Sequence, residues 1–221
     1  MGKDLRTLPE SLREQTERWL ERYGESAHAG ELSRLVACSE FAGGVVLRDK
    51  DWFLENVPTF SEPPDIRALD QLLPDAATPE QARPLLRRFR NRYLLHVIWR
   101  EIFALADLDE TLESLSSLAD RMLDIATGVA ERALEPRYGI VRDTNGDKVP
   151  LVVLGMGKLG GRELNLSSDI DLIFLYPDDG ETDGRKCVSA QEYFGRLAMQ
   201  VIALLDETTV DGFVFRIDTR L

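Results

Sequence analysis

Two aspartates, Asp169 and Asp171, stand two residues apart at the start of an apolar run. Successive side chains of a β-strand point to opposite faces, so both carboxylates would lie on one face of a strand. Carboxylates about 7 Å apart at their Cα atoms repel each other unless a cation lies between them. Mg²⁺ takes carboxylate oxygens and keeps positions for phosphate, so the pair predicts a metal site. The alternative for an Asp-x-Asp pair alone is a solvated strand edge or turn.

A glycine-rich turn precedes these aspartates and favours the metal-site interpretation. Four glycines follow the apolar run 149–154, at Gly155, Gly157, Gly160 and Gly161. Because glycine leaves the backbone N–H groups uncovered, a phosphate can approach such a turn closely. Lys158 adds a mobile positive charge suited to a phosphate oxygen. The turn therefore predicts a nucleotide-phosphate site beside the metal.

Two better-known nucleotide motifs do not fit this turn. A P-loop lysine is followed by Ser or Thr, whereas Lys158 is followed by leucine. The turn does spell G-x-G-x-x-G from Gly155 to Gly160, as dinucleotide-binding turns do. However, only residues 161–168 separate it from the strand expected at Asp169, and a parallel crossover needs about a dozen residues or more. The dinucleotide fold is excluded on length.

Asp218 is a candidate third carboxylate. The segment Gly212–Arg220 alternates apolar and polar residues, which places Arg216, Asp218 and Arg220 on one face of a second strand. Three aspartates from two neighbouring strands are what a two-metal phosphoryl or nucleotidyl transfer site requires. A charged strand face without ligand is the alternative.

The amino-acid sequences of these segments resemble those of the bifunctional glutamine synthetase adenylyltransferase/adenylyl-removing family of bacteria. The resemblance is carried by GMGKLGGRELNLSSDIDLIFLYP and by DGFVFRIDTRL, and more weakly by Ala37–Phe41 and Leu86–Glu101. The letters NLSSDIDLIF are similar to the first of that family's two nucleotidyltransferase domains, the adenylyl-removing one, within the DNA polymerase beta-like superfamily. Gly157-Lys158 stands at the position where the superfamily's pattern has Gly-Ser. The superfamily's contact between serine and phosphate is therefore not expected in this chain.

The resemblance implies a set of site residues and ligands. It implies that Asp169, Asp171 and Asp218 are the catalytic carboxylates and hold Mg²⁺ or Mn²⁺. It also implies that the phosphates of ADP or ATP bind near Gly157, Lys158, Gly160, Ser168 and Arg220.

The implied reaction is metal-dependent removal of AMP from an adenylylated tyrosine of glutamine synthetase, with phosphate attacking and ADP leaving. The implied partners are glutamine synthetase and a PII-type regulatory signal protein. A different class of function stays open, namely a noncatalytic module that docks glutamine synthetase or a regulatory protein. Activity of the isolated chain would separate the two.

Composition indicates a globular cytoplasmic protein. The chain has 221 residues, 43% hydrophobic and 30% charged, with a formal net charge of −12. The negative charge argues against a nucleic-acid surface, because phosphate neutralisation supplies most nonspecific affinity. The charged N-terminal stretch lacks the apolar run of a signal peptide, and no apolar run approaches the ~18 residues of a membrane span, so no membrane partner is expected. Cys38 and Cys187 fit no C-x-x-C spacing and are expected to be reduced thiols.

The expected fold is α+β, with a mostly helical region over residues 1–136 and a mixed-sheet polymerase beta-like nucleotidyltransferase domain over 137–221. The family continues well beyond Leu221, so this domain is expected to be incomplete at its C-terminus. Apolar periodicity predicts helices over Pro9–Tyr23, Glu31–Arg48, Pro79–Ala106, Glu110–Leu134 and Ala190–Asp206, with Asp109 as a cap. Asn145-Gly146 predicts a hairpin turn into a strand at Val149.

Five arginines between Arg83 and Arg92 form a basic cluster on the third of these helices. A phosphate or an acidic partner patch could bind there. The interpretation we favour is a solvated face paired with acidic neighbours, because runs of charged residues on helices usually form such faces. His28 and His96 have no convergent partner and are expected to be structural.

Overall fold

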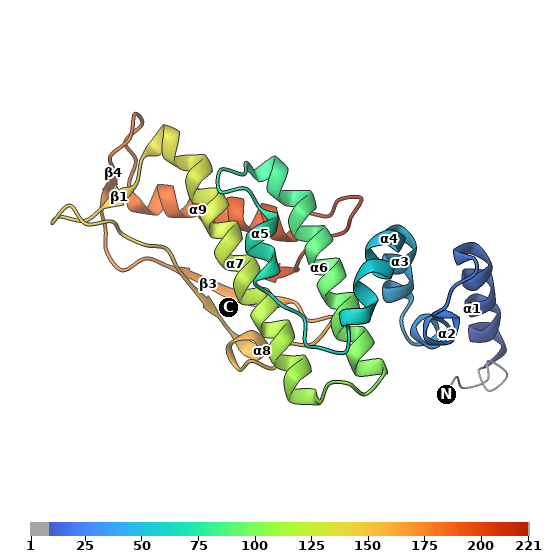
Figure 1. Ribbon diagram of the computed structural model, residues 1–221. Helices are drawn as coiled ribbons and strands as arrows, with labels where there is room; N and C mark the ends of the chain where they lie inside the picture. Colours follow the sequence, from blue (N-terminus) through green and yellow to red (C-terminus); the bar gives the residue numbers. More distant parts are fainter. Residues whose placement is uncertain (1–8, 221) are drawn as a thin grey trace. The chain divides into compact units, whose positions relative to one another are not determined.

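The computed structural model describes residues 9–220 and has the expected α+β class, mostly helical with two small sheets (Figure 1). The elements up to residue 138 are α1 (Glu10–Tyr23), α2 (Ala29–Cys38), α3 (Glu40–Arg48), α4 (Lys50–Asn56), a short 3₁₀ helix (Val57–Thr59), α5 (Ala68–Leu72), α6 (Pro79–Ile102) and α7 (Leu108–Tyr138). They are followed by β1 (Val141–Arg142), β2 (Val152–Gly155), α8 (Gly157–Gly160), β3 (Ile170–Leu175), β4 (Glu181–Thr182), α9 (Ala190–Asp206) and β5 (Ile217–Asp218).

Most predicted helices are confirmed, but three local predictions are wrong. The strand expected to begin at Val149 begins only at Val152. The single helix expected over Glu31–Arg48 is divided at Ser39, which is extended and accepts a hydrogen bond from the backbone N–H of Ala42 at 3.2 Å. A serine in this role begins a new helix, because its side chain satisfies an N–H group that the first turn leaves free. The cap of α7 is Asp107 rather than Asp109, since the carboxylate of Asp107 accepts from the N–H of Glu110 at 2.8 Å.

The chain forms two compact units, each discontinuous in sequence. The first comprises residues 1–64 and 91–111, and its core is aromatic. Phe53, Phe60 and Trp99 are buried there with ring centroids 5.8 to 6.1 Å apart. His96 stacks on Phe60 at 4.2 Å, and burial lowers its pKa to about 4. This packing is consistent with the structural role expected for His96.

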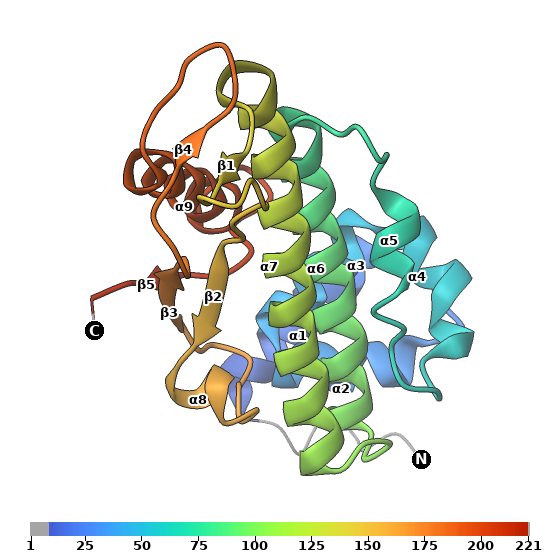
Figure 2. The same cartoon turned by 90° about the vertical axis from the view of Figure 1, so that its left-hand side faces the viewer.

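The second unit comprises residues 65–90 and 112–221 and contains both sheets. In the three-stranded sheet, β3 lies in the middle, pairs antiparallel with β2 and pairs parallel with β5. Figure 2 shows these strands beside α7, with α8 at the end of β2. The antiparallel pairing of β2 with β3 confirms that the glycine turn does not begin a parallel crossover. The smaller sheet pairs β1 with β4.

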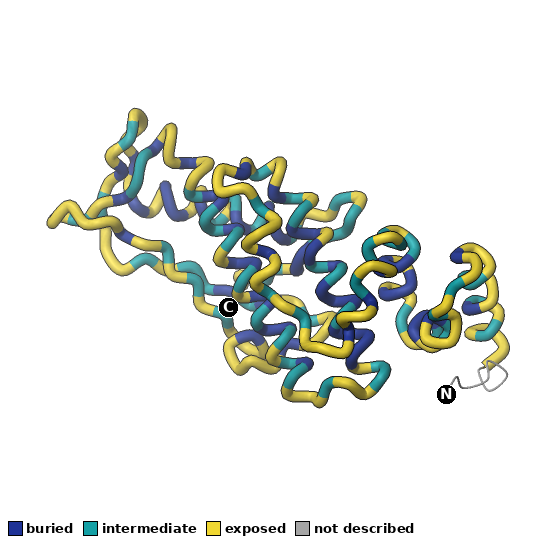
Figure 3. The backbone as a smooth tube through the Cα atoms, in the orientation of Figure 1, coloured by how far each residue is buried: buried dark blue, intermediate teal, exposed yellow. Residues whose placement is uncertain are grey.

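Burial in the second unit places one face of β3 in the core and leaves the other more open (Figure 3). Ile170 and Leu172 are buried, whereas Asp171 and Ile173 are half-buried. The long helix α7 contributes a buried stripe to the same unit, formed by Leu115, Leu118, Met122, Val129 and their neighbours. None of the described helices combines the length and apolarity needed to cross a bilayer. Cys38 and Cys187 are both free thiols.

The arginine cluster on α6 only partly matches the interpretation made from the sequence. Arg83 pairs with Glu207 at 3.2 Å and Arg92 with Asp49 at 2.9 Å, as expected, but Arg87 departs from it. Arg87 is fully buried and donates to the carbonyl oxygens of Gly212 at 2.8 Å, Leu204 at 3.1 Å and Glu207. Its guanidinium therefore closes the C-terminal end of α9 and holds the loop that leads into β5. Arg88 is exposed. The sequence pattern could not indicate this difference, because the acceptors are backbone groups more than a hundred residues away.

We expect Arg87→Leu to lower the free energy of unfolding by about 3 to 5 kcal/mol, because a buried guanidinium would lose its hydrogen bonds to three backbone carbonyls, of which the Leu204 carbonyl is buried. Arg88→Leu is the matched control on the adjacent residue and should change stability by less than about 0.5 kcal/mol. Urea denaturation of the two variants measures both values. Equal stability of the two variants would contradict the role given to Arg87.

Candidate functional site

Two of the three predicted carboxylates are direct neighbours across the sheet. β3 and β5 run parallel, and Asp171 is the cross-strand partner of Asp218. Adjacent strands lie about 4.8 Å apart, so these two side chains leave the backbone side by side. Asp169 lies one residue before β3 and two residues before Asp171. The sequence therefore placed the acidic residues on neighbouring strands, and the structure supplies their register.

Arginines hold two of these carboxylates. Asp169 forms an ion pair with Arg216, whose Nε lies 2.7 Å from Asp169 Oδ1. Asp218 accepts hydrogen bonds from Arg220, at 2.8 Å from its backbone N–H and 2.9 Å from Nη2. The Arg220 hydrogen bonds lower the pKa of Asp218 to about 2, so that carboxylate is ionised at neutral pH. Arg216 was placed on the polar face by the alternating pattern, but its pairing with Asp169 was not predicted.

Among residues 9–220, no group of three or more metal-ligating side chains is close enough together to hold a metal ion. The metal assignment of Asp169, Asp171 and Asp218 therefore stays a prediction. The donor set itself fits a hard divalent cation, because all three groups offer carboxylate oxygens. The competing ion pairs are solvent-exposed, with more than half of the Arg216 and Asp169 side chains accessible. Such pairs contribute about 0 to 1 kcal/mol, so a cation can displace the arginines at little cost.

The glycine turn is folded directly against Asp171. The backbone N–H of Met156 donates to the carbonyl oxygen of Asp171 at 2.8 Å. Gly157 has a φ of +52°, and a methyl group on it would lie 2.8 Å from Asp171 Oδ2. The positive φ therefore favours glycine at this position, and a side chain there would displace the Asp171 carboxylate. Gly160 packs on the opposite side of the turn, where an added Cβ would lie 2.5 Å from the carbonyl oxygen of Gly155.

The other residues predicted at the phosphate site lie around this turn. Lys158 is exposed on α8, and its ammonium makes no ion pair with any residue that the structure describes. Ser168 is half-buried, and its hydroxyl hydrogen-bonds to the side chain of Asn165. Arg220 is exposed and is held by Asp218. Contact of these groups with a nucleotide stays a prediction.

Arg162 fastens the glycine turn to α7 and was missed by sequence reasoning. Its φ is +56°, which is uncommon for a residue with a side chain. The guanidinium donates to the carboxylates of Glu113 and of Asp120, the latter at 2.9 Å, and to Ser117 Oγ at 3.0 Å. These bonds raise the pKa of Arg162 and lower that of Glu113. No periodicity marks Arg162, because its partners lie on a helix more than forty residues earlier.

The open face of the sheet continues from the carboxylates as an apolar surface. Cross-strand partners lie on the same face, so Val152 with Leu175 and Leu154 with Ile173 extend the face of Asp171. Val152, Leu154 and Leu175 are 40%, 41% and 45% exposed, which is unusual for strand residues of this size. The carboxylates therefore lie at the edge of an uncovered apolar patch.

Comparison with known proteins places the chain in one family. The family model described as glutamate-ammonia ligase adenylyltransferase matches residues 29–221. The chain is similar to the bifunctional glutamine synthetase adenylyltransferase/adenylyl-removing enzyme of Thioalkalivibrio sulfidiphilus, with 42% identity over 98% of this chain and 24% of that protein. The enzyme of the same name from Pseudomonas aeruginosa is 43% identical over 86% of this chain and 20% of its own length.

A third relative of that name, from Nitrosococcus oceani, is 46% identical over 71% of this chain and 16% of its own length. The chain thus spans about a fifth of the curated relatives that it matches.

We expect Arg162→Ala to loosen the glycine turn without unfolding the protein, because it removes the connection between the turn and α7. Amide hydrogen exchange of residues 155–161 should accelerate about fivefold to tenfold, which corresponds to about 1 kcal/mol of local stability. Arg67→Ala is the control, since Arg67 forms an exposed ion pair only with Asp65. Unchanged exchange at the turn in Arg162→Ala would show that the contacts with α7 do not hold it.

Proposed function

The chain belongs to the glutamate-ammonia ligase adenylyltransferase family, and from this premise we propose that its carboxylate site removes AMP from an adenylylated tyrosine of glutamine synthetase. The observation that carries the proposal is the pairing of Asp171 with Asp218 on adjacent parallel strands, with Gly157 against Asp171. Within the proposal, residues 137–221 form the nucleotidyltransferase domain and residues 1–136 the helical region that precedes it. The relatives' names cover both adenylyl transfer and adenylyl removal. We propose adenylyl removal rather than transfer because the sequence of residues 165–174 resembles that of the adenylyl-removing domain.

The proposed reaction is phosphorolysis. An oxygen of orthophosphate attacks the phosphorus of the tyrosyl-AMP diester, the bond from phosphorus to the tyrosine oxygen breaks, and ADP is formed. The released tyrosine oxygen takes up one proton. Two anionic groups must approach each other in this step, so stabilisation of charge rather than covalent catalysis supplies most of the acceleration.

The side chains around the turn have distinct proposed roles. Asp169, Asp171 and Asp218 would hold Mg²⁺ or Mn²⁺, which when bound neutralises charge on the transferring phosphoryl group. Gly157 and Gly160 keep the backbone close to the phosphates, and Lys158 contributes a positive charge. Ser168 and Arg220 complete the proposed phosphate contacts. The exposed apolar face beside Asp171 offers a surface for the aromatic ring of the substrate tyrosine or of adenine.

One observation favours a second candidate, a noncatalytic docking module for glutamine synthetase or a PII-type regulatory protein. Asp169 and Asp218 are both occupied by arginines, and the described residues contain no assembled group of three metal ligands. In this alternative the acidic strands serve only to orient the arginines. The two candidates differ in whether the chain turns over substrate.

We expect the chain to release ADP from adenylylated glutamine synthetase when orthophosphate and Mg²⁺ are present, and EDTA to abolish the release. Asp171→Asn should lower the rate by about a hundredfold or more, because it removes a charge from the centre of the proposed metal site. Asp178→Asn, on an exposed residue after β3, is the matched control. ADP release that is unaffected by EDTA and by Asp171→Asn would exclude this site. Binding of glutamine synthetase without ADP release would support the docking module.

Lys158→Ala tests the phosphate role of the turn in a form of the protein that releases ADP. Loss of one charge-assisted contact is worth about 1.5 to 3 kcal/mol, so turnover should fall about tenfold to a hundredfold while the fold is retained. The control is Lys148→Ala, because Lys148 is also exposed but pairs with Glu131 at 3.1 Å. Equal turnover of the two variants would make Lys158 an ordinary surface lysine.

A further inference from the structure

One aromatic ring lies beside the carboxylate site, in the loop that leads into β5. Phe213 is half-buried, and the guanidinium carbons of Arg90 and Arg216 lie 5.5 and 5.9 Å from its ring centroid. We infer that Phe213 is a positioning residue of this site, because its ring holds the guanidinium of Arg216 against Asp169. The inference rests on the proposed function in one respect, namely that a divalent cation competes with Arg216 for Asp169.

The local backbone explains how Phe213 reaches Arg216. In an extended strand, residues three apart point to opposite faces, so the alternating pattern of this segment would separate the two side chains. The chain instead bends at the buried residue Val214 and enters β5 only at Ile217. The bend brings the ring and the guanidinium together.

The ring is fixed from the side of α6. Arg90 belongs to this helix, and burial lowers the pKa of its guanidinium to about 10. A desolvated guanidinium gains more from the face of an aromatic ring than an exposed one does. The residue before the ring is held as well, since the carbonyl oxygen of Gly212 accepts from Arg87 Nε at 2.8 Å. Phe213 is therefore the fixed partner in its contact with Arg216.

Arg216 is the movable partner, because its side chain is 59% exposed. Its Nε lies 2.7 Å from Asp169 Oδ1, and its Nη2 donates to the carbonyl oxygen of Ser167 at 3.4 Å. An exposed ion pair alone gains little, because the entropy lost in holding long side chains offsets the attraction. A ring beside the planar guanidinium restricts its orientation, so the ring favours the paired state.

This positioning has a consequence for metal binding. A divalent cation that takes the carboxylate of Asp169 must displace Arg216 from it. Any contact that stabilises the ion pair therefore weakens the cation, since the two compete for one carboxylate. Phe213, which touches no carboxylate itself, thus influences the metal affinity of the site through Arg216.

The first measurement follows the Arg216 Nε–H group of the whole chain by NMR in metal-free buffer, with Arg216→Lys identifying its signal. Phe213→Leu should accelerate hydrogen exchange of this group about twofold to fivefold, which is the factor expected from one cation–π contact at an exposed site. Phe213→Tyr keeps the ring and should restore the wild-type rate. Tyr176→Leu is the matched control, because it removes another half-buried ring of the second unit, one that stacks on Phe194 instead.

The second measurement is Mn²⁺ binding by calorimetry. Phe213→Leu should tighten Mn²⁺ about twofold to fivefold, because a weaker ion pair leaves Asp169 freer for the cation. In an Arg216→Met background the same change should have no effect, since the competing guanidinium is already absent. A role of Phe213 in folding alone would alter Mn²⁺ binding equally in both backgrounds.

Either measurement can overturn the inference. The same Arg216 Nε–H exchange rate in Phe213→Leu and in the wild type would show that the ring does not hold the guanidinium. An equal effect of Phe213→Leu on Mn²⁺ binding with and without Arg216 would show that Phe213 does not act through it. Absence of Mn²⁺ binding in every form would instead refute the metal assignment of the proposed function, and the exchange rates would still decide the role of Phe213.

Discussion

The parallel pairing of β3 with β5 is the constraint on which the candidate site depends. It sets Asp171 beside Asp218, and two ionised carboxylates at that spacing repel each other. Positive charges from the same segment offset this repulsion, with Arg220 on Asp218 and Arg216 on the adjacent Asp169. The result is an alternating cluster of acidic and basic side chains, in which the pair of Asp169 with Arg216 is solvent-exposed and therefore contributes about 0 to 1 kcal/mol.

A strand of two residues cannot fix this pairing by itself, so other parts of the second unit hold it. The buried guanidinium of Arg87 donates hydrogen bonds to the carbonyl of Leu204 near the end of α9 and to that of Gly212 in the loop before β5. On the other side of the sheet, Arg162 connects the glycine turn to α7. Gly157 then brings the backbone close to Asp171, where a side chain would displace the carboxylate. Contacts with helices α6, α7 and α9 thus determine the positions of the site residues, which lie on short strands and in the glycine turn.

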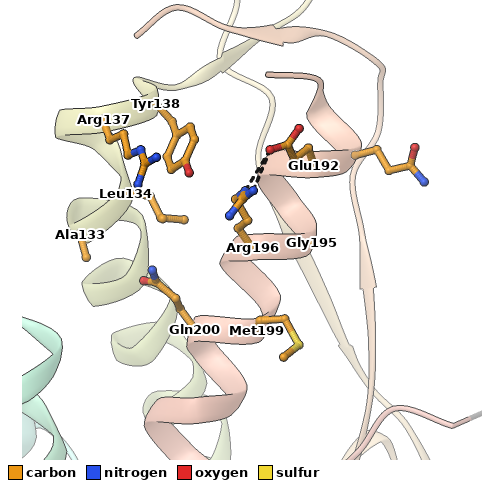
Figure 4. Close-up of a pocket in the computed structure, with 10 residues that line it drawn as sticks. Ala133, Leu134, Arg137, Tyr138, Glu192, Gly195, Arg196, Met199 and Gln200 are labelled. Carbon is orange, nitrogen blue, oxygen red and sulfur yellow. Dashed lines mark hydrogen bonds and ion pairs between the residues drawn. The ribbon is translucent and has the colours of Figure 1, made fainter. Parts of the chain in front are cut away.

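Helices α7 and α9 also form a second concave surface, lined by Leu134 and Arg137 of α7 and by Arg196 of α9, which has a different chemistry (Figure 4). The carboxylate site is acidic, exposed and bordered by apolar strand residues. The groove between α7 and α9 is basic around Tyr138 and contains a buried amide oxygen.

The sequence alone determined the class of the fold, most helix positions and which residues share a strand face, because periods of two and 3.6 residues are local properties. It also excluded a parallel crossover after the glycine turn, because chain length limits what eight residues can span. Tertiary structure decided the register that pairs Asp171 with Asp218, the burial of Arg87 and the attachment of Arg162 to α7. Each of these joins groups more than forty residues apart, often through backbone carbonyls that every residue possesses. No local pattern of side chains can specify such a partner.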